Sequence, residues 1–165
     1  MSKGRATRYA IEADIPEIVR IINAAFRVED FFIDGDRTNA ADIGARMADP
    51  RVRFLVVGAD EPGVLAAAVV VDVHDDRGHF AMLSVDPPLQ GRGLARVLMN
   101  AVEDHCWAEG CDTVEIEVVN LREELPAFYN AMGYLPADTA PFPDKAKLRR
   151  DAHMVLMTKR LSASS

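Results

Sequence analysis

The chain has 165 residues, 49% of them apolar, so it is long enough to bury the core of one domain, and we expect a single domain over residues 1–165. It carries 26 acidic and 19 basic residues, and the net charge of −7 argues against nucleic acid as a partner. The sequence has no run of 18 apolar residues, and its first ten residues have no apolar segment typical of a secretory signal, so we expect neither a membrane span nor export.

The two cysteines point to a reducing compartment. Cys106 and Cys111 stand five residues apart, outside any C-x-x-C motif and away from a histidine cluster. This spacing is not that of a metal site or of a disulfide framework. We therefore predict free thiols, no bound metal and a cytoplasmic location.

The first half of the chain predicts a strand, two helices and a three-stranded meander. Asp14, with Glu17 three residues later, has the D-x-x-E pattern of a helix capping box. Apolar residues then recur at helical spacing at positions 15, 18, 19, 22 and 26. Short loops between the later strands favour antiparallel pairing. The expected elements are a strand over 7–11, a helix from 14, a loop with short helix over 27–38, a helix over 40–48, and strands over 52–58, 64–73 and 79–85.

The second half alternates helices with strands. A helix is predicted over 94–109 with Gly110 just beyond its end, followed by a strand over 113–119. Another helix runs to about residue 132, with Pro126 near its start and Gly133 at its end, and a last strand covers 153–160. The order β-α-α-β-β-β-α-β-α-β predicts a mixed α/β domain.

A glycine loop stands between the strand over 79–85 and the helix over 94–109. It lacks the G-x-x-x-x-G-K-[ST] pattern of a P-loop, and Gly91 and Gly93 supply only two of the three glycines of a dinucleotide fingerprint. A helix N-terminus has free amides and a partial positive charge, so such a loop can hold a pyrophosphate, with Arg92 and Arg96 adding charge. A plain tight turn is the alternative interpretation.

Two sequence blocks resemble one protein family. Q-G-R-G-L-A at residues 90–95 resembles the [RQ]-x-x-G-x-[GA] motif of the GNAT superfamily of acetyl-CoA-dependent N-acetyltransferases. Asn120 ends the next predicted strand, F-Y at residues 128–129 lies on the following helix, and G-Y at residues 133–134 closes that helix as in the family. The order of elements resembles the family over nearly the whole chain.

This resemblance implies a fold and a cosubstrate. The fold is a mixed, mostly antiparallel sheet with helices on both faces and a splayed cleft between the fourth and fifth strands. The cosubstrate is acetyl-CoA, with its pyrophosphate at the glycine loop and its pantetheine arm along the fourth strand, and no metal is needed. The cofactor-binding residues that the resemblance implies are Leu83, Ser84, Val85, Gln90, Gly91, Arg92, Gly93, Leu94, Ala95, Arg96, Asn120 and Phe128.

The resemblance also implies the chemistry, direct attack of a primary amine on the thioester in a ternary complex. Tyr129 would protonate the leaving sulfur, although a helical tyrosine with a wet hydroxyl is the plainer interpretation. The general base stays open. Strand alternation puts His79 on the face of Val85, but six residues and about 20 Å away, too far for direct proton transfer. Glu117, beside Glu115 on the other face of the fifth strand from its apolar residues, is the second candidate.

The acceptor is expected to be a small-molecule or peptide amine, and the protein a monomer or a homodimer. In the family, the loop after the first helix borders the acceptor site, and a negative rim there would attract a cationic amine, unless its charges are simply solvated. The carboxylates of this predicted rim are Glu29, Asp30, Asp34 and Asp36. A CoA-binding sensor without turnover and a transferase that uses a longer acyl-CoA are the alternative functions.

Overall fold

The computed structural model describes residues 6–162, and within them seven strands form one sheet in the order β1-β2-β3-β4-β5-β7-β6. All neighbouring strands are antiparallel except β4 and β5, which are parallel. The mixed, mostly antiparallel α/β fold predicted from the sequence is therefore confirmed. The strands are β1 (Thr7–Tyr9), β2 (Val52–Gly58), β3 (Leu65–His74), β4 (Arg77–Val85), β5 (Thr113–Val119), β6 (Leu135–Pro141) and β7 (His153–Arg160).

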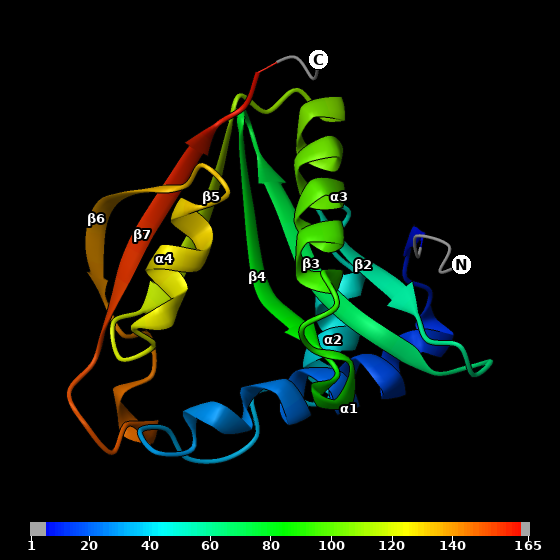
Figure 1. Ribbon diagram of the computed structural model, residues 1–165, viewed down its shortest axis with the longest axis horizontal. Helices are drawn as coiled ribbons and strands as arrows, with labels where there is room; N and C mark the ends of the chain where they lie inside the picture. Colours follow the sequence, from blue (N-terminus) through cyan, green and yellow to red (C-terminus); the bar gives the residue numbers. More distant parts are fainter. Residues whose placement is uncertain (1–5, 163–165) are drawn as a thin grey trace.

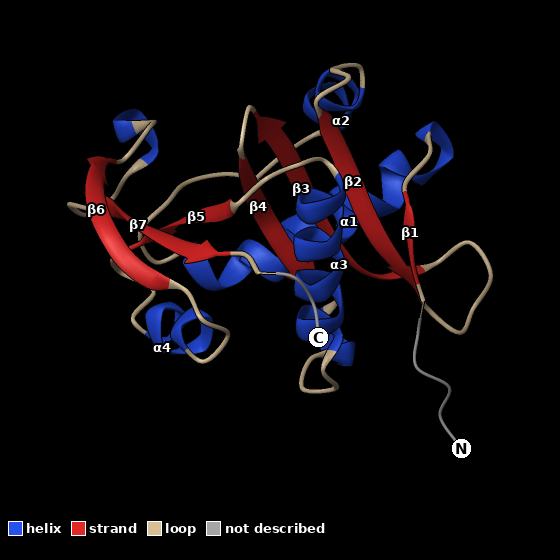
Figure 2. Cartoon of the chain, turned by 90° about the horizontal axis from the view of Figure 1, so that it is seen from above, coloured by secondary structure: helices blue, strands red, loops and turns tan. Residues whose placement is uncertain are grey.

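Helices cover both faces of this sheet, as expected (Figure 2). One face carries α3 and α4, and the other carries α1 and α2. The helices are α1 (Ile15–Ala25), α2 (Ala40–Met47), α3 (Leu94–Ala108) and α4 (Glu124–Asn130), and the short 3-10 turns are η1 (Glu12–Asp14), η2 (Phe26–Glu29), η3 (Pro87–Leu89) and η4 (Lys145–Lys147). Among residues 6–162, no helix is long and apolar enough to cross a bilayer.

The sheet separates two hydrophobic cores. Leu98 and Val102 of α3 pack on one face, and Ile18 and Ile22 of α1 pack on the other. The first seven residues of β3 are all buried, which is typical of a central strand covered on both sides. These two cores hold β3 in place, and β4 is held on one side by its pairing with β3.

On its other side β4 separates from β5. The two strands pair only at Arg77↔Thr113, Gly78↔Val114 and His79↔Glu115, and beyond these pairs no register joins them in the described chain. Figure 1 shows the strands close together at one end and far apart at the other, with the segment after α1 crossing the open end. The predicted splay between the fourth and fifth strands is confirmed.

A β-bulge in β4 corrects one prediction. Met82 has a φ of 54°, and the register with β3 shifts beside it. As a result Ala81 and Met82 pack with the α1 core, whereas Leu83 and Val85 pack with the α3 core. The bulge interrupts the alternation of side chains, so the prediction that His79 shares a face with Val85 is wrong.

The start of α1 differs from the predicted capping box. The Asp14 carboxylate accepts a hydrogen bond from the Ile11 backbone N–H at 2.8 Å and is paired with Arg8. Glu17 instead accepts from the Leu65 backbone N–H at 3.0 Å. The chain turns helical two residues earlier than predicted, in η1, so Asp14 caps that turn from its end and not from its beginning.

The edge strand β6 is the one strand of the described sheet that the sequence did not predict. Its sequence, L-P-A-D-T-A-P, contains two prolines and has no alternation of apolar residues. Its residues are mostly exposed, and it pairs only with β7. An edge strand tolerates proline because one of its sides needs no hydrogen-bond donors.

Candidate active site

A cavity of about 550 Å³ lies between the N-terminus of α3, the end of β4 and α4, and we call it the α3 cavity. It collects most of the residues that the sequence predicted for cofactor binding, from three separate elements. The predicted residues that line it are Leu83, Val85, Gln90, Gly91, Gly93, Leu94, Ala95, Arg96 and Phe128.

The N-terminus of α3 forms one end of this cavity. Gly93 is the N-cap residue with a φ of 80°, and Gly91 has a φ of 81°, both in the left-handed region that favours glycine. A Cβ built at either position would meet no heavy atom within 4 Å, so the space beside the loop is open. The first amides of the helix have no partner within it, and together with the helix dipole they make this end suited to an anion.

The free edge of β4 forms a second wall. Beyond His79 the strand has no β5 partner among the described residues, and Leu83 and Val85 line the cavity there. Ser84 is buried and turns inward, since its hydroxyl donates to the Met82 carbonyl at 2.9 Å. A strand edge with unpaired amides and carbonyls can take an extended ligand with amide groups of its own.

Tyr129 stands at the inner end of the α3 cavity. Its side chain is only 5% exposed, and its ring contacts those of Phe80 and Phe128 edge to face. Burial raises the pKa of its phenol, and the hydroxyl makes no hydrogen bond to any group within residues 6–162. A protonated hydroxyl without a protein partner is available to a ligand.

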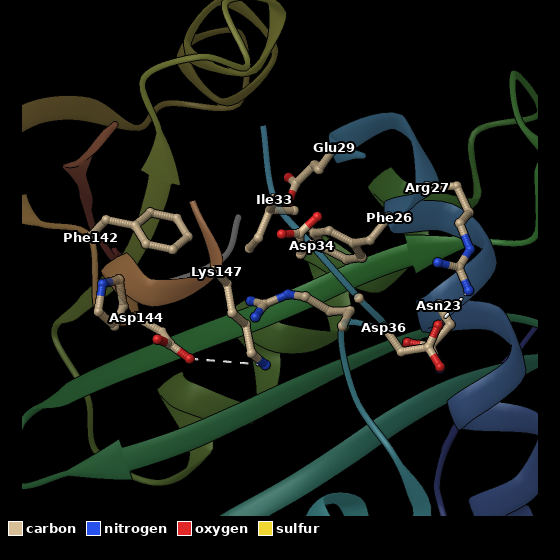
Figure 3. A pocket seen from close by; sticks show the side chains of 13 residues that line it. Asn23, Phe26, Arg27, Glu29, Ile33, Asp34, Asp36, Phe142, Asp144 and Lys147 are labelled. Carbon is tan, nitrogen blue, oxygen red and sulfur yellow. Dashed lines mark hydrogen bonds and ion pairs between the residues drawn. The ribbon is translucent and has the colours of Figure 1, made fainter. Parts of the chain in front are cut away.

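Two smaller cavities lie beside the α3 cavity, and Tyr129 lines one of them. The cleft cavity, about 140 Å³, lies between β4 and β5 and is lined by Leu83, Glu117 and Tyr129 among others. The loop cavity, about 120 Å³, lies under the segment that follows α1 (Figure 3). Phe26 lines all three cavities, so they lie next to one another.

A buried ion pair closes the cleft. Glu29 is 7% exposed, and its carboxylate accepts a hydrogen bond from the Arg122 guanidinium at 3.0 Å. Burial raises the pKa of Glu29, while Arg122 and Arg37 act in the opposite direction. The pair joins the segment after α1 to the segment after β5, so it ties together the two sides of the open end.

The predicted negative rim does not form. The Asp34 carboxylate is paired with Arg149, and the Asp36 carboxylate is paired with Arg27. Asp30 also lies near Arg27, at 3.9 Å. Cations from the same loop and from the segment before β7 neutralise these carboxylates, which the order of residues in the sequence did not indicate.

Of the two candidates for the general base, Glu117 lines the cleft cavity. His79 lines none of the three and instead bonds Asp72 on β3, with 3.2 Å between Nδ1 and the carboxylate. The hydrogen bond with Asp72 is the main cause of a raised His79 pKa, and Glu117 and Glu115 act in the same direction. A histidine held by a neighbouring strand is suited to a structural role.

Three predicted cofactor residues do not line the α3 cavity: the inward-turned Ser84, and Asn120 and Arg92. The Asn120 side-chain oxygen accepts from the His153 backbone N–H at 2.8 Å, so it joins β5 to β7 and lines a different pocket. Arg92 is exposed and lines none of the three cavities. Conversely, Arg122 and Arg37 line cavities and were missed, because a single arginine in a loop carries no motif.

The described part of the chain has no cluster of side chains that could bind a metal ion. Within residues 6–162, no three side chains of the histidine, cysteine, aspartate or glutamate type converge as a metal site. Cys106 on α3 and Cys111 just beyond it are free and buried, and neither lines any of the three cavities.

The sequence matches a family model described as "Acetyltransferase (GNAT) family" over residues 15–134. It is also similar to proteins named mycothiol acetyltransferase. The protein from Gordonia bronchialis is 33% identical over 135 residues, which are 79% of this chain and 43% of that protein. The protein from Beutenbergia cavernae is 36% identical over 94 residues, 56% of this chain and 31% of that protein. The chain thus spans less than half the length of these curated relatives.

Solved structures share the fold at low sequence identity. The ribosomal-protein-S18-alanine N-acetyltransferase from Escherichia coli superposes with a TM-score of 0.76 at 18% identity, covering 98% of this chain and 97% of that one. A phosphinothricin acetyltransferase from Sinorhizobium meliloti, solved in complex with AcCoA, gives 0.77 at 15% identity, covering 99% and 91%.

Proposed function

Because this chain belongs to the acetyltransferase (GNAT) family, we propose that it transfers an acetyl group from acetyl-CoA to a primary amine. The observation that supports this best is that two cavities meet at Tyr129. The α3 cavity runs from the open N-terminus of α3 to Tyr129, and the cleft cavity continues from Tyr129 to Glu117. A donor and an acceptor can therefore meet at Tyr129 from opposite sides.

The residues of the α3 cavity fit the two ends of the donor. The amides at the N-terminus of α3, with the Arg96 side chain beside them, would hold the pyrophosphate. The free edge of β4 at Leu83 and Val85 would pair with the amides of the pantetheine arm. When bound, acetyl-CoA supplies an activated thioester carbonyl and a thiolate leaving group.

Tyr129 is the proposed general acid. Its raised pKa keeps the hydroxyl protonated at neutral pH, so it can donate a proton to a departing thiolate. An unpaired backbone N–H on the edge of β4 would stabilise negative charge on the carbonyl oxygen. Both groups are fixed before any ligand arrives, since the Tyr129 ring packs against Phe80 and β4 is paired with β3.

Glu117 is the proposed general base. Its carboxylate lies on the cleft side, where an amine must lose a proton before it attacks. A water between the carboxylate and the ammonium group would carry that proton. His79 is left out of this proposal because it lies outside the cavities and is held by Asp72.

A turnover screen tests this function. Release of the CoA thiol is measured with acetyl-CoA and a panel of primary amines, including amines related to mycothiol because two relatives carry that name. We expect amine-dependent release and an acetylated amine by mass spectrometry. Tight binding of acetyl-CoA without any amine-dependent release would favour a CoA sensor, and faster release from a longer acyl-CoA would favour a different donor.

A further inference from the structure

The loop cavity extends the acceptor side of the site. It shares Phe26, Glu29 and Arg37 with the cleft cavity, so a molecule in the cleft can reach into it. Figure 3 shows Phe26, from the segment after α1, and Phe142, from the segment after β6, on opposite sides of the space. The chemistry of this extension therefore bears on which amines the protein accepts.

The carboxylates that line the loop cavity already have cationic partners. Asp34 pairs with Arg149, and Asp36 pairs with Arg27. Asp144 lies 4.0 Å from the Lys147 ammonium group. With Glu29 paired to Arg122, the carboxylates here are poorly suited to recognise a second cation on the acceptor.

Arg37 is the exception among the cations. It lines both the loop cavity and the cleft cavity, yet within residues 6–162 its side chain forms no ion pair and no hydrogen bond, and the nearby charges of Glu29 and Asp42 act on it without direct contact. Its guanidinium lies over the Phe26 ring, 5.1 Å from the centroid, and that contact leaves the N–H donors at its edge free. A guanidinium is charged at every physiological pH, and its forked donors match a carboxylate or a phosphonate.

Glu117 is the matching anion. It lines the cleft cavity and, like Arg37, has no ion pair or hydrogen bond with any described residue. The two adjacent cavities thus offer a cation that lines both and an anion in the cleft, neither of which forms an ion pair or a side-chain hydrogen bond within residues 6–162. A molecule with an ammonium group and an anionic group separated by a short chain would complement both charges.

We propose that the acceptor is a small amine that also carries an anionic group, a carboxylate or a phosphonate, which Arg37 binds. This inference rests on the proposed function and narrows its acceptor. The cleft and loop cavities, about 140 and 120 Å³, favour a molecule of amino-acid size over a folded protein. Arg37 acts here as a binding residue at the end of the acceptor away from the reacting nitrogen.

The test compares acceptors that differ only in this charge. Glycine, β-alanine, 4-aminobutyrate and the twenty L-amino acids are assayed with acetyl-CoA beside their carboxamides, and aminomethylphosphonate tests the second anion. Each kcat/KM is divided by the neutral fraction of that amine, because an amide lowers the pKa of a nearby amino group. We expect the best acid to exceed its amide by about tenfold or more, as for a charge-assisted hydrogen bond.

Variants then assign the preference to Arg37. Arg37→Met keeps an unbranched side chain but removes the guanidinium, and it should lower kcat/KM for the acid about tenfold through KM, with the amide unchanged. Arg37→Lys should keep part of the preference. Arg46→Met is the control, since Arg46 is a nearby arginine on α2 that pairs with Asp42 and lines none of the three cavities.

The failure of this inference is distinct from the failure of the proposed function. Wild-type protein that acetylates amides or simple alkylamines as well as acids, or an Arg37→Met variant that loses both substrates equally, would overturn the inference alone. No calorimetric binding of acetyl-CoA would overturn the function. If acetyl-CoA binds without turnover, calorimetry of the CoA-loaded protein compares the affinity for 4-aminobutyrate with the affinity for its amide. Equal affinities, or no binding of either compound, would overturn the inference.

Discussion

The ring of Tyr129 packs edge to face against the ring of Phe80, with 5.9 Å between their centroids. Phe80 belongs to β4 and is fully buried, whereas Tyr129 belongs to α4, which follows β5 in the chain. The contact therefore bridges the two strands where they have already separated. The contact holds the Tyr129 ring, and with it the hydroxyl, against β4, the strand proposed to bind acetyl-CoA. We therefore expect small changes at this contact to affect catalysis more than stability.

Removal of the Tyr129 hydroxyl should impair turnover selectively. Tyr129→Phe keeps the ring contacts with Phe80 and Phe128, so we expect folding and acetyl-CoA affinity to change little. Loss of a general acid lowers kcat by roughly 10²–10⁴-fold. Steady-state kinetics and calorimetry on the same preparation measure both effects. An unchanged kcat, with chemistry shown to be rate-limiting, would assign the proton to a different group.

A charge at Gly93 should weaken acetyl-CoA binding. Gly93→Asp adds a Cβ at a φ of 80°, which costs about 1–2 kcal/mol of stability, and it places a carboxylate where an anion would bind. Gly63→Asp is the matched control, because Gly63 has a φ of 79° and an equally open surrounding in the turn between β2 and β3. Both variants should lose similar stability in urea, but only Gly93→Asp should lose affinity in calorimetry. Equal affinities would place the donor elsewhere.

The Glu29–Arg122 pair should show an asymmetric response to mutation. Arg122→Met leaves a buried carboxylate without its partner and should cost about 3 kcal/mol in the free energy of unfolding. The double variant Glu29→Gln/Arg122→Met removes that charge as well and should recover part of the loss. Urea denaturation at pH 7 measures all three proteins. A double variant no more stable than Arg122→Met would mean that the side chain of Arg122 acts through packing alone.

The His79–Asp72 pair should stabilise the fold in a defined pH range. The hydrogen bond with Asp72 raises the pKa of His79, so the protonated imidazole favours the folded state. That contribution to stability is complete below about pH 6.5, which is the pKa of histidine in the unfolded chain. It is lost as the pH rises through the higher pKa that His79 has in the folded protein. The Asp72 pKa is lowered by His79 against the effect of its own burial, so the pair persists down to about pH 4.

His79→Gln should therefore cost more stability at pH 5.5 than at pH 9. Urea denaturation of wild type and variant at both values gives the comparison. His153→Gln, at an exposed position on β7, is the control for a histidine replaced outside such a pair. A difference between wild type and His79→Gln that is the same at both pH values would mean that His79 contributes only by packing.

Much of the fold could be predicted because its central elements obey simple periodicities. The bounds of β2 and β5 match the predicted residue ranges, since both strands have clear apolar runs ended by turn residues. By contrast, β6 forms only because β7 offers it a partner, and its own prolines predict a loop. Long-range pairing outweighed local preference there.

The candidate site also contains residues that a local sequence pattern predicts and residues that only long-range contacts place. Gly91, Gly93 and Tyr129 lie in motifs of consecutive residues, and the structure brings all three to one cavity. The bulge at Met82 depends on how β4 fits β3, so alternation along β4 could not reveal that His79 faces away from Val85. Arg37 and the partners of the acidic loop depend on contacts between distant segments, which no local pattern contains.

The shared wall between the α3 cavity and the cleft cavity has a kinetic consequence. Five residues border both spaces, namely Phe26, Leu83, Arg122, Leu125 and Tyr129, while the α3 cavity alone reaches the N-terminus of α3 and the cleft cavity alone reaches β5. An occupant of one space leaves the entrance of the other open, so neither substrate has to depart before the second one enters. Initial rates at varied concentrations of both substrates should then give double-reciprocal lines that intersect, and a single molecule joining CoA to an amino acid should bind more tightly than either half.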